Sequence, residues 1–385
     1  MIFHPALKHG ISITAFVISF SCLITACEKN VKQESTSKNS GTDTTFNKEK
    51  GLLTIIGVGD IMLGSNYPSS ASLPPDDGKD LLTDVREYLQ DADITTGNLE
   101  GTLLNSGGTP KKCREKSEKS EIETGYIKEN CHSFRMPERY AGYLKEAGFD
   151  YVNLANNHSG DMGEQGREST YKTLDEYEIA YAGTLEYPTA KIEKDGIKYG
   201  FAGFAPNRGT CNINDLEKAK DIVKEIKLEC DIVIVFFHGG AEGISAQHIP
   251  MRQEVFLGEN RGDVYEFAHA VVDAGADIVF GSGPHVTRAV ELYKDRFIAY
   301  SLGNFCTYGK FSLSGAMGIA PIIKVFVNKK GEFQKGEIIP VKQIKRGFTV
   351  KDESGSVINI IRQLTRSDIP SSKISINDDG LIEKK

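Results

Sequence analysis

The sequence predicts an α/β layer fold with apolar strands at the centre of its sheets. From Leu52 onwards, short β-rich runs alternate with segments of helical pattern. The central runs are apolar almost throughout, which is typical of strands that are covered on both faces. Many of these runs end in polar residues or glycine. Ligands of such folds bind beyond the carboxyl ends of the strands, so we expect a functional site there.

Each expected strand is a short run rich in β-branched and aromatic residues. These runs occupy residues 52–58, 94–100, 151–155, 231–237, 277–280 and 297–301. The first is followed by Asp60, and the second ends in Asn98-Leu99-Glu100. The third is followed by the polar cluster NLANNHSGDMG, which begins at Asn153. The strand ends therefore carry most of the candidate site residues.

Helices are expected between these strands. In residues 80–90, leucine and valine recur at helical spacing. Residues 137–147 begin with proline and are followed by glycine, which suit the first turn and the C-cap of a helix. Residues 262–273 likewise end shortly before a glycine. Residues 321–327 and 332–341 flank the turn sequence NKKG and are expected to form a hairpin.

The composition is that of an ordinary globular protein: 39% of the 385 residues are hydrophobic, 26% are charged, and tryptophan is absent. This length allows one large domain with appendages. The formal net charge is −7, and lysine and arginine form no clustered stripe. Nucleic acid is therefore not expected as a partner.

Residues 1–27 are expected to be a lipoprotein signal peptide. An apolar run from Ile11 to Ile24 is shorter than the about 20 residues that span a bilayer. It ends in Thr25-Ala26-Cys27, small residues before a cysteine, as in bacterial lipoproteins. We expect Cys27 to be lipidated, so that the protein is exported and anchored on the outer face of the membrane. A plain signal peptide or a buried helix is the alternative.

Residues 28–50 are polar and are expected to be a disordered linker. Further along, Cys113 and Cys131 bracket a charged insertion with little apolar content, and we expect them to form a disulfide. A zinc site is the weaker alternative, because no CxxC or paired Cys/His spacing is present. The pairing of the three later cysteines stays open.

Polar groups suited to metal binding or proton transfer follow five of the strand-like runs. They are Asp60, Glu100, Asn157, His158, His238 and His285. Taken singly, each has a plain alternative, because asparagine, aspartate and glycine are common in turns and a lone histidine is often a surface residue. Their recurrence at successive strand ends predicts one composite polar site.

Carboxylate, amide oxygen and imidazole together suit a divalent ion such as Mn²⁺, Zn²⁺ or Fe²⁺. We expect His158 to donate a proton or stabilise developing charge, and Asp161 to orient it. Other chemistry has little support, because the sequence contains no GxxxxGK[ST] loop and no GxSxG nucleophile elbow. Cys306 has no adjacent base in the sequence that would activate its thiol.

Six ordered motifs resemble the bacterial capsule-synthesis CapA family, also called poly-γ-glutamate capsule proteins. They are GVGDIMLGS, NLEGTL, NLANNHSGDMGEQG, HGGAEG, DAGADIVFGSGPHVTRAVELY and IAYSLGNF. The resemblance covers residues 52–345. It implies a calcineurin-like metallophosphatase fold, with a two-layered β-sheet core in the order α/β/β/α. We therefore expect a domain at residues 51–348 and a C-terminal extension at 349–385.

The resemblance also implies roles for the site residues. Asp60 matches the first metal ligand and Glu100 the bridging carboxylate. Asn157 and His158 match a ligand and a catalytic imidazole. The late histidine ligands are matched by His238 and His285.

Two departures stand out, because Met62 occupies a position that is generally histidine in metallophosphatases, and GSGPH replaces the GHHPH or GHGPH of many family members. A centre with two ions, one ion or none stays open.

Two functions follow from this. The first is a metal-dependent hydrolase of phosphoesterase type in the cell envelope, involved in the synthesis or export of poly-γ-glutamate or a related capsule polymer. The second is a non-catalytic lipoprotein that binds, tethers or exports an anionic polymer beside capsule-polymer synthesis proteins. A retained site favours the first, and the residues at positions 62 and 282 favour the second.

Overall fold

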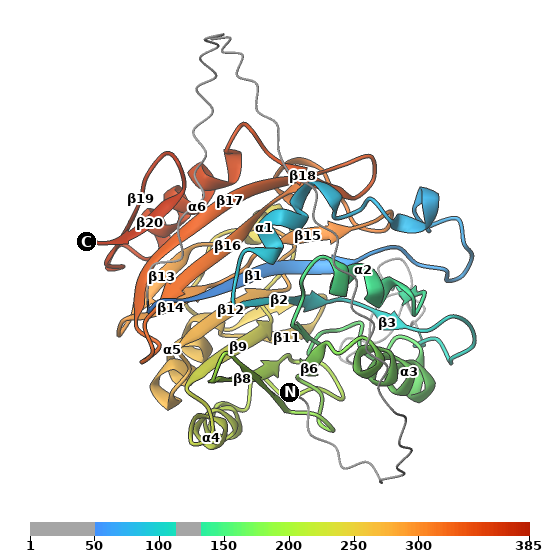
Figure 1. The fold of residues 1–385 in the computed structure, drawn as a ribbon, viewed down its shortest axis with the longest axis horizontal. Coiled ribbons are helices and arrows are strands. Elements are labelled where there is room, and N and C mark those ends of the chain that lie inside the picture. Colours follow the sequence, from blue (N-terminus) through green and yellow to red (C-terminus); the bar gives the residue numbers. More distant parts are fainter. Residues whose placement is uncertain (1–50, 113–131) are drawn as a thin grey trace, which may run out of the picture. The chain divides into compact units, whose positions relative to one another are not determined.

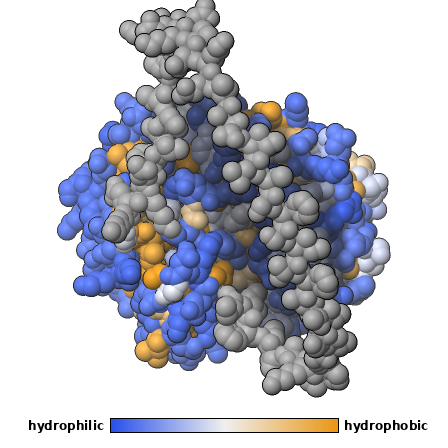
Figure 2. All heavy atoms as spheres, in the orientation of Figure 1, coloured by the Kyte–Doolittle hydropathy of each residue, from blue (hydrophilic) through white to orange (hydrophobic). Residues whose placement is uncertain are grey.

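The computed structural model describes residues 51–112 and 132–385. The expected signal peptide, the polar linker, Cys27, Cys113 and Cys131 lie outside the described residues. Within the described ranges, no helix has both the length and the apolar character needed to cross a bilayer. The surface in Figure 2 is mostly hydrophilic where it is coloured, with a few apolar spots.

The larger of the two main sheets has ten strands. In spatial order, its main path is β19 (Ile374–Ile376), β20 (Leu381–Lys384), β17 (Phe333–Ile344), β16 (Ile319–Val327), β1 (Leu53–Met62), β2 (Ile94–Leu99), β5 (Tyr151–Asn153) and β6 (Ala180–Ala182). Off this path, β15 (Asn304–Thr307) pairs with β1, and β18 (Phe348–Lys351) pairs with β17. The strands β1, β2, β5, β6 and β15 run parallel, so their carboxyl ends meet at one edge.

The smaller main sheet has six strands. Their order is β13 (Val290–Tyr293), β14 (Arg296–Ala299), β12 (Ile278–Ser282), β9 (Ile232–His238), β8 (Ile197–Phe204) and β7 (Thr189–Lys194). The four central strands are parallel and the outer two are antiparallel. Two short pairs complete the strands: β10 (Glu254–Phe256) with β11 (Glu259–Gly262), and β3 (Thr102–Leu103) with β4 (Arg135–Met136).

The two main sheets pack face to face, with helices outside each of them (Figure 1). Side chains of both sheets, among them Ile55, Phe236 and Phe280, form one buried cluster between the sheets. The larger sheet shares a second cluster with α1 (Arg86–Gln90), α2 (Tyr140–Glu146) and α3 (Gly163–Glu176). The smaller sheet shares a third with α4 (Leu216–Lys227) and α5 (Val264–Ala274). The predicted α/β/β/α order is therefore confirmed.

Most of the expected elements are present, including the hairpin of β16 and β17. Residues 80–90 form not one helix but a 3₁₀ turn (Thr83–Val85) followed by α1, because Val85 has a ψ of −1° that interrupts the helix. The strand expected at 151–155 ends at Asn153, whose side chain bonds the backbone of Ala155 in a turn. The other 3₁₀ turns within residues 51–112 and 132–385 are Pro75–Gly78, Ile244–Ala246 and Gly315–Gly318.

Residues 349–385, set apart above as an extension, pack as part of the same compact unit. The helix α6 (Ser356–Asp368) contacts β13, β16 and β17. Strands β19 and β20 extend the larger sheet beyond β17. Strands β19 and β20 lie on the side away from the carboxyl ends of β1 and β2, where the polar site is expected (Figure 1). The Thr349 hydroxyl of β18, by contrast, donates to Phe305 O of β15 at 2.7 Å.

Candidate metal centre

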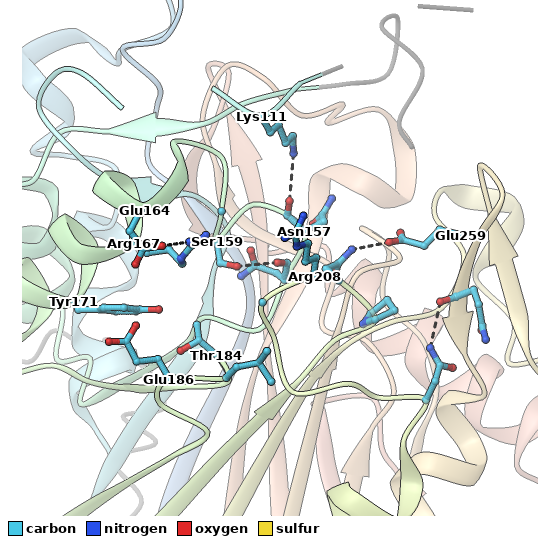
Figure 3. Close-up of a pocket in the computed structure, with 18 of the residues that line it drawn as sticks. Lys111, Asn157, Ser159, Glu164, Arg167, Tyr171, Thr184, Glu186, Arg208 and Glu259 are labelled. Carbon is cyan, nitrogen blue, oxygen red and sulfur yellow. Dashed lines mark hydrogen bonds and ion pairs between the residues drawn. The ribbon is translucent and has the colours of Figure 1, made fainter. Parts of the chain in front are cut away.

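Two adjoining cavities open at the carboxyl ends of the parallel strands. The larger has a volume of about 1040 Å³ and is shown in Figure 3. The smaller has a volume of about 260 Å³ and is lined by His158, His285 and other residues. Lys111, Asn157 and Leu257 line both cavities. Three of the predicted site residues, Asn157, His158 and His285, therefore line a hollow that is large enough for a ligand.

The strand register builds a row of polar side chains across the larger sheet. Asp60 of β1 is paired with Asn98 of β2 and, on its other side, with Asn304 of β15. Asn98 is in turn paired with Asn153 of β5. Its Nδ2 donates to Asp60 Oδ1 at 2.9 Å, and its Oδ1 accepts from Asn153 Nδ2 at 2.9 Å. All four residues are fully buried, so this row fixes the Asp60 carboxylate.

The smaller sheet contributes His238, the last residue of β9. Its register partner is Ser282 of β12. The Ser282 hydroxyl donates to Phe237 O at 3.3 Å, and its oxygen lies 3.2 Å from His238 Nδ1. When Nδ1 donates to this oxygen, Nε2 carries the lone pair. That Nε2 is buried and has no hydrogen-bond partner among the described residues, which suits a metal ligand.

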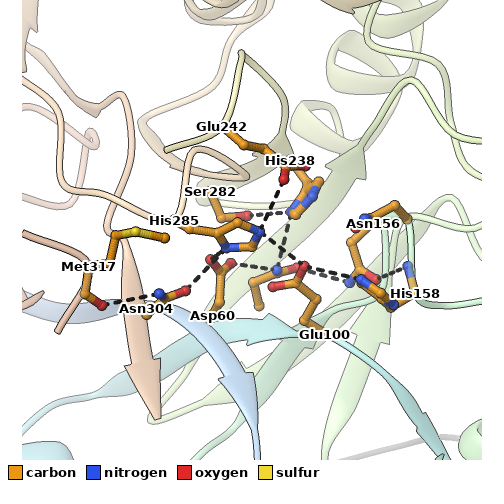
Figure 4. A network of polar contacts seen from close by, with 12 residues as sticks. Asp60, Glu100, Asn156, His158, His238, Glu242, Ser282, His285, Asn304 and Met317 are labelled. Carbon is orange, nitrogen blue, oxygen red and sulfur yellow. Dashed lines mark hydrogen bonds and ion pairs between the residues drawn. The ribbon is translucent and has the colours of Figure 1, made fainter. Parts of the chain in front are cut away.

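Three of the predicted residues form a compact group (Figure 4). One ligand atom each from Asp60, Glu100 and His285 lies within 4.8 Å of the others. His285 Nδ1 is 2.9 Å from Asp60 Oδ2, and His285 Nε2 is 3.8 Å from Glu100 Oε1. Both Glu100 carboxylate oxygens are buried and lack a hydrogen-bond partner within the described ranges. His285 has a φ of +58°, the left-handed region that a non-glycine residue rarely adopts.

The pKa shifts in this group show that its carboxylates favour a bound positive charge. Burial, followed by repulsion from Asp60, raises the pKa of Glu100 well above its ordinary value. For His285, burial lowers the pKa, but Glu100 and Asp60 outweigh burial and raise it to about 10. A proton on His285 thus offsets the carboxylates when no metal is bound. Two carboxylates and imidazoles with unused atoms fit a divalent ion, which would supply the same charge.

His158 lies at the opposite wall of the smaller cavity. Its Nδ1 is 2.7 Å from Asp161 Oδ2, as predicted, and its ring stacks on Phe134 with centroids 4.2 Å apart. Lys111 Nζ approaches the other Asp161 oxygen to 2.6 Å. Burial, reinforced by Lys111 and opposed by Asp161, lowers the pKa of His158 to about 4. The imidazole is therefore neutral at physiological pH, with Nε2 3.8 Å from Glu100 Oε1.

The two asparagines after β5 have different roles. Asn156, which the sequence analysis did not single out, donates to Asn98 Oδ1 at 3.1 Å and to Leu99 O at 2.9 Å. Its own Oδ1 accepts from the backbone N–H of His158 at 3.0 Å. Asn157, the predicted ligand, lines both cavities, and its Oδ1 is buried without a hydrogen-bond partner among the described residues. That oxygen remains available to a ligand.

Glu242 is a further site residue that sequence reasoning missed. Its Oε2 lies 3.9 Å from His285 Nε2, and its Oε1 lies 3.3 Å from Arg261 Nη1. The sequence signal was its position four residues after His238, in the loop that follows β9. Met62, by contrast, is fully buried in the core beside the larger sheet. It provides no ligand atom of the kind that histidine would.

The cysteines within the described ranges take no visible part in the site. Cys211, Cys230 and Cys306 are buried and free. Burial raises the pKa of the Cys306 thiol to about 12, which keeps it protonated and unreactive.

Comparison with known proteins agrees with the motifs. The family described as "Bacterial capsule synthesis protein PGA_cap" matches residues 54–308. The chain belongs to this family. The capsule biosynthesis protein CapA of Bacillus anthracis is 31% identical over 280 residues, which cover 67% of this chain and 60% of that protein. The PGA biosynthesis protein CapA of Bacillus subtilis (strain 168) is 29% identical over 270 residues, 66% of this chain and 63% of that protein.

This PGA_cap chain thus spans less than two thirds of the length of either relative. Among solved structures, a hypothetical protein from Thermus thermophilus aligns with a TM-score of 0.44 and 16% identity, over 76% of this chain and 100% of that one. The calcineurin-like phosphoesterase YfkN from Bacillus subtilis aligns with a TM-score of 0.42 and 16% identity, over 83% of this chain and 98% of that one.

Proposed function

We propose that this protein acts in the synthesis or export of poly-γ-glutamate or a related capsule polymer, as a metal-dependent hydrolase of phosphoesterase type. Membership of the capsule synthesis family supports the process. One observation carries the chemistry: Glu100 is fully buried against Asp60 and His285, and neither of its carboxylate oxygens has a hydrogen-bond partner among the described residues. A buried carboxylate of this kind is costly unless a cation binds it.

Asp60, Glu100 and His285 would hold the ion, with His238 and Asn157 as further ligands. A bound Mn²⁺, Zn²⁺ or Fe²⁺ would polarise a phosphoryl or acyl oxygen and lower the pKa of a water molecule.

The remaining chemistry belongs to His158 and its neighbours. Asp161 accepts from Nδ1, so Nε2 is the atom that takes or gives a proton at the smaller cavity. Phe134 covers one face of the ring and holds it in place. Since Nε2 lies 3.8 Å from Glu100 Oε1, the proton is exchanged beside the proposed ion.

The competing function is a polymer-binding or tethering scaffold without catalysis. Met62 and Ser282 favour it, because both stand where related proteins carry histidine. Ser282 is used to orient His238, so the smaller sheet retains one imidazole. Met62 contributes only to the core, which leaves one fewer imidazole on the larger sheet.

The proposal includes export and anchoring through a lipid on Cys27, which would place the protein beside capsule-polymer synthesis proteins at the membrane. Stable anchoring needs more than one acyl chain. Replacing Cys27 with serine should release the protein from the membrane fraction or block its processing. An unchanged distribution and N-terminal mass would contradict the anchor. The proposed Cys113–Cys131 disulfide is tested separately by peptide mapping without reductant, and two free thiols would exclude it.

The deciding experiment is metal analysis of the purified protein, combined with a panel of phosphatase and peptidase substrates. Bound metal with turnover that is lost in Asp60→Asn supports the hydrolase. Bound metal with no turnover on any substrate supports the scaffold. If no divalent ion binds or stabilises the wild-type protein, the hydrolase proposal fails.

A further inference from the structure

The larger cavity extends away from the metal group towards α3 and the loops after β8 and β10. Its volume of about 1040 Å³ exceeds what a single phosphate or metal ion needs. Figure 3 shows Glu164, Arg167 and Tyr171 of α3 on one side and Glu259 on the other. Five of its lining side chains are the amides of Asn156, Asn157, Asn207, Asn214 and Asn260. We call this cavity the asparagine groove.

The charges in the groove are balanced. Its lining includes three basic and three acidic side chains: Lys111, Arg167, Arg208, Glu164, Glu186 and Glu259. Lys111 is paired with Asp161, and Arg167 with Glu164, so these basic charges are already compensated. The whole chain carries a net charge of −7. A groove that paired every carboxylate of a bound polyanion would need an excess of positive charge, which these lining residues do not supply, so most carboxylates of such a chain would have to face solvent.

Arg208 differs from the other basic residues of the groove. It is exposed and makes no hydrogen bond or ion pair with any described residue. Its backbone is nevertheless fixed on both sides. Gly209 O accepts from Leu185 N at 3.0 Å, and the Thr210 hydroxyl donates to Asn207 O at 2.7 Å. The loop therefore presents one uncompensated guanidinium at a defined place, and a guanidinium binds a carboxylate through paired hydrogen bonds.

The amide side chains define the rest of the ligand. An amide both donates and accepts, as does a peptide bond, so a cavity lined by asparagines matches an amide-linked chain. Asn157 stands where the groove meets the smaller cavity, and its buried Oδ1 has no hydrogen-bond partner among the described residues. A donor from a bound chain, or the metal ion, would satisfy this atom.

We propose that the asparagine groove binds an amide-linked chain, and that Arg208 recognises one of its carboxylates while neutral hydrogen bonds hold the remainder. Arg208 would thereby set which part of the chain reaches the metal group. This inference rests on the proposed function for the identity of the chain, a γ-linked glutamate polymer. Binding in the groove is nevertheless measurable without metal and without turnover.

The test is calorimetric titration of metal-free protein with a short γ-linked glutamate oligomer. Arg208→Gln should weaken binding by about tenfold or more, because a charge-assisted hydrogen bond is lost. The affinity of Arg208→Lys should lie between those of wild type and Arg208→Gln, since lysine keeps the charge without the planar pair of donors. The matched control is Arg252→Gln, which removes an exposed arginine outside the groove and should change the affinity by less than about twofold.

Salt and a second ligand class sharpen the test. With one ion pair, an about fourfold increase in salt should weaken binding by only about threefold. A loss of several hundredfold would mean that many charges are engaged and would overturn the proposal. So would an oligomer affinity that is the same in wild type and Arg208→Gln. Tight binding of maltohexaose that survives Arg208→Gln would instead make the groove a carbohydrate site. Absence of metal or turnover would count only against the proposed function.

Discussion

Two histidines face each other across the same small cavity, and their surroundings give them opposite properties. His285 lies against Asp60 and Glu100, whose charges outweigh burial and raise its pKa to about 10. His158 is equally buried, but burial and Lys111 together outweigh Asp161 and lower its pKa to about 4. One wall of the cavity therefore has an excess of negative charge, and the other is already compensated.

This difference assigns the two walls to different tasks. A buried carboxylate pair that only the proton on His285 offsets is suited to binding a cation, so the His285 wall is the ion-binding wall. A neutral imidazole held by an aspartate is suited to exchanging a proton, so the His158 wall is the proton-transfer wall. Burial contributes most to the low pKa of His158, and Lys111, which lines both cavities and pairs with Asp161, lowers it further.

The largest expected effect comes from breaking the proton-transfer wall alone. His158→Ala should lower kcat by about 10²–10⁴, the usual contribution of a positioned acid or base. Metal affinity should stay within about threefold of wild type, because His158 is not counted among the ligands. Steady-state kinetics and calorimetry on the same preparation measure the two quantities. Equal losses in both would mean that the walls are not separate.

Removing charge from the ion-binding wall should instead weaken metal binding. Glu100→Gln should weaken metal binding by about a hundredfold, in line with the loss of one interaction of a buried charge. The metal-free protein should become more stable, because a buried carboxylate that faces Asp60 is removed.

Glu291→Gln is the control for this variant. Glu291 is also buried, but it is bonded to His269 and Tyr300 and lies outside both cavities. It should lose stability and keep metal affinity. Thermal unfolding with and without metal separates these outcomes, and a destabilised metal-free Glu100→Gln would argue against the ion-binding wall.

A pH titration tests the same wall with a smaller effect. A metal ion needs the neutral imidazole, and the pKa of His285 is raised to about 10 in the metal-free protein. Below that pH, binding must displace a proton, so affinity should rise by about tenfold for each pH unit. Calorimetry in buffers of different ionisation enthalpy should show about one proton released per ion at neutral pH. A pH-independent affinity, with no proton released, would contradict this.

Most of the site residues could be predicted from the sequence, because the ends of strands are recognisable from local sequence. Asp60, Glu100 and His285 could be predicted from the apolar runs that precede them and from the motifs that contain them. Asn98 and Asn153 did not stand out, because their contribution comes from the pairing of β1, β2 and β5, a register that no local pattern reveals. The choice between Asn156 and Asn157 likewise depends on the turn that ends β5.

The fold, too, combines features that local sequence predicts with features that it does not. Alternating strands and helices predicted the α/β layers, whereas the packing of residues 349–385 onto the larger sheet depends on long-range contacts that have no local signature. The charge state of each wall was also hidden, since it is set by burial and by Lys111, which approaches Asp161 from 50 positions earlier in the chain.

The smallest expected effect concerns Lys111 itself. Its charge lowers the pKa of His158, so Lys111→Met should raise that pKa and move the matching limb of the pH–rate profile to higher pH. At neutral pH, kcat should change by less than about tenfold, since Asp161 still orients the ring. The neighbouring Lys112→Met removes an exposed lysine and should leave the profile where it was. If the Lys111 variant lowers metal affinity instead, without moving the profile, its charge serves the ion-binding wall and the division between the two walls is lost.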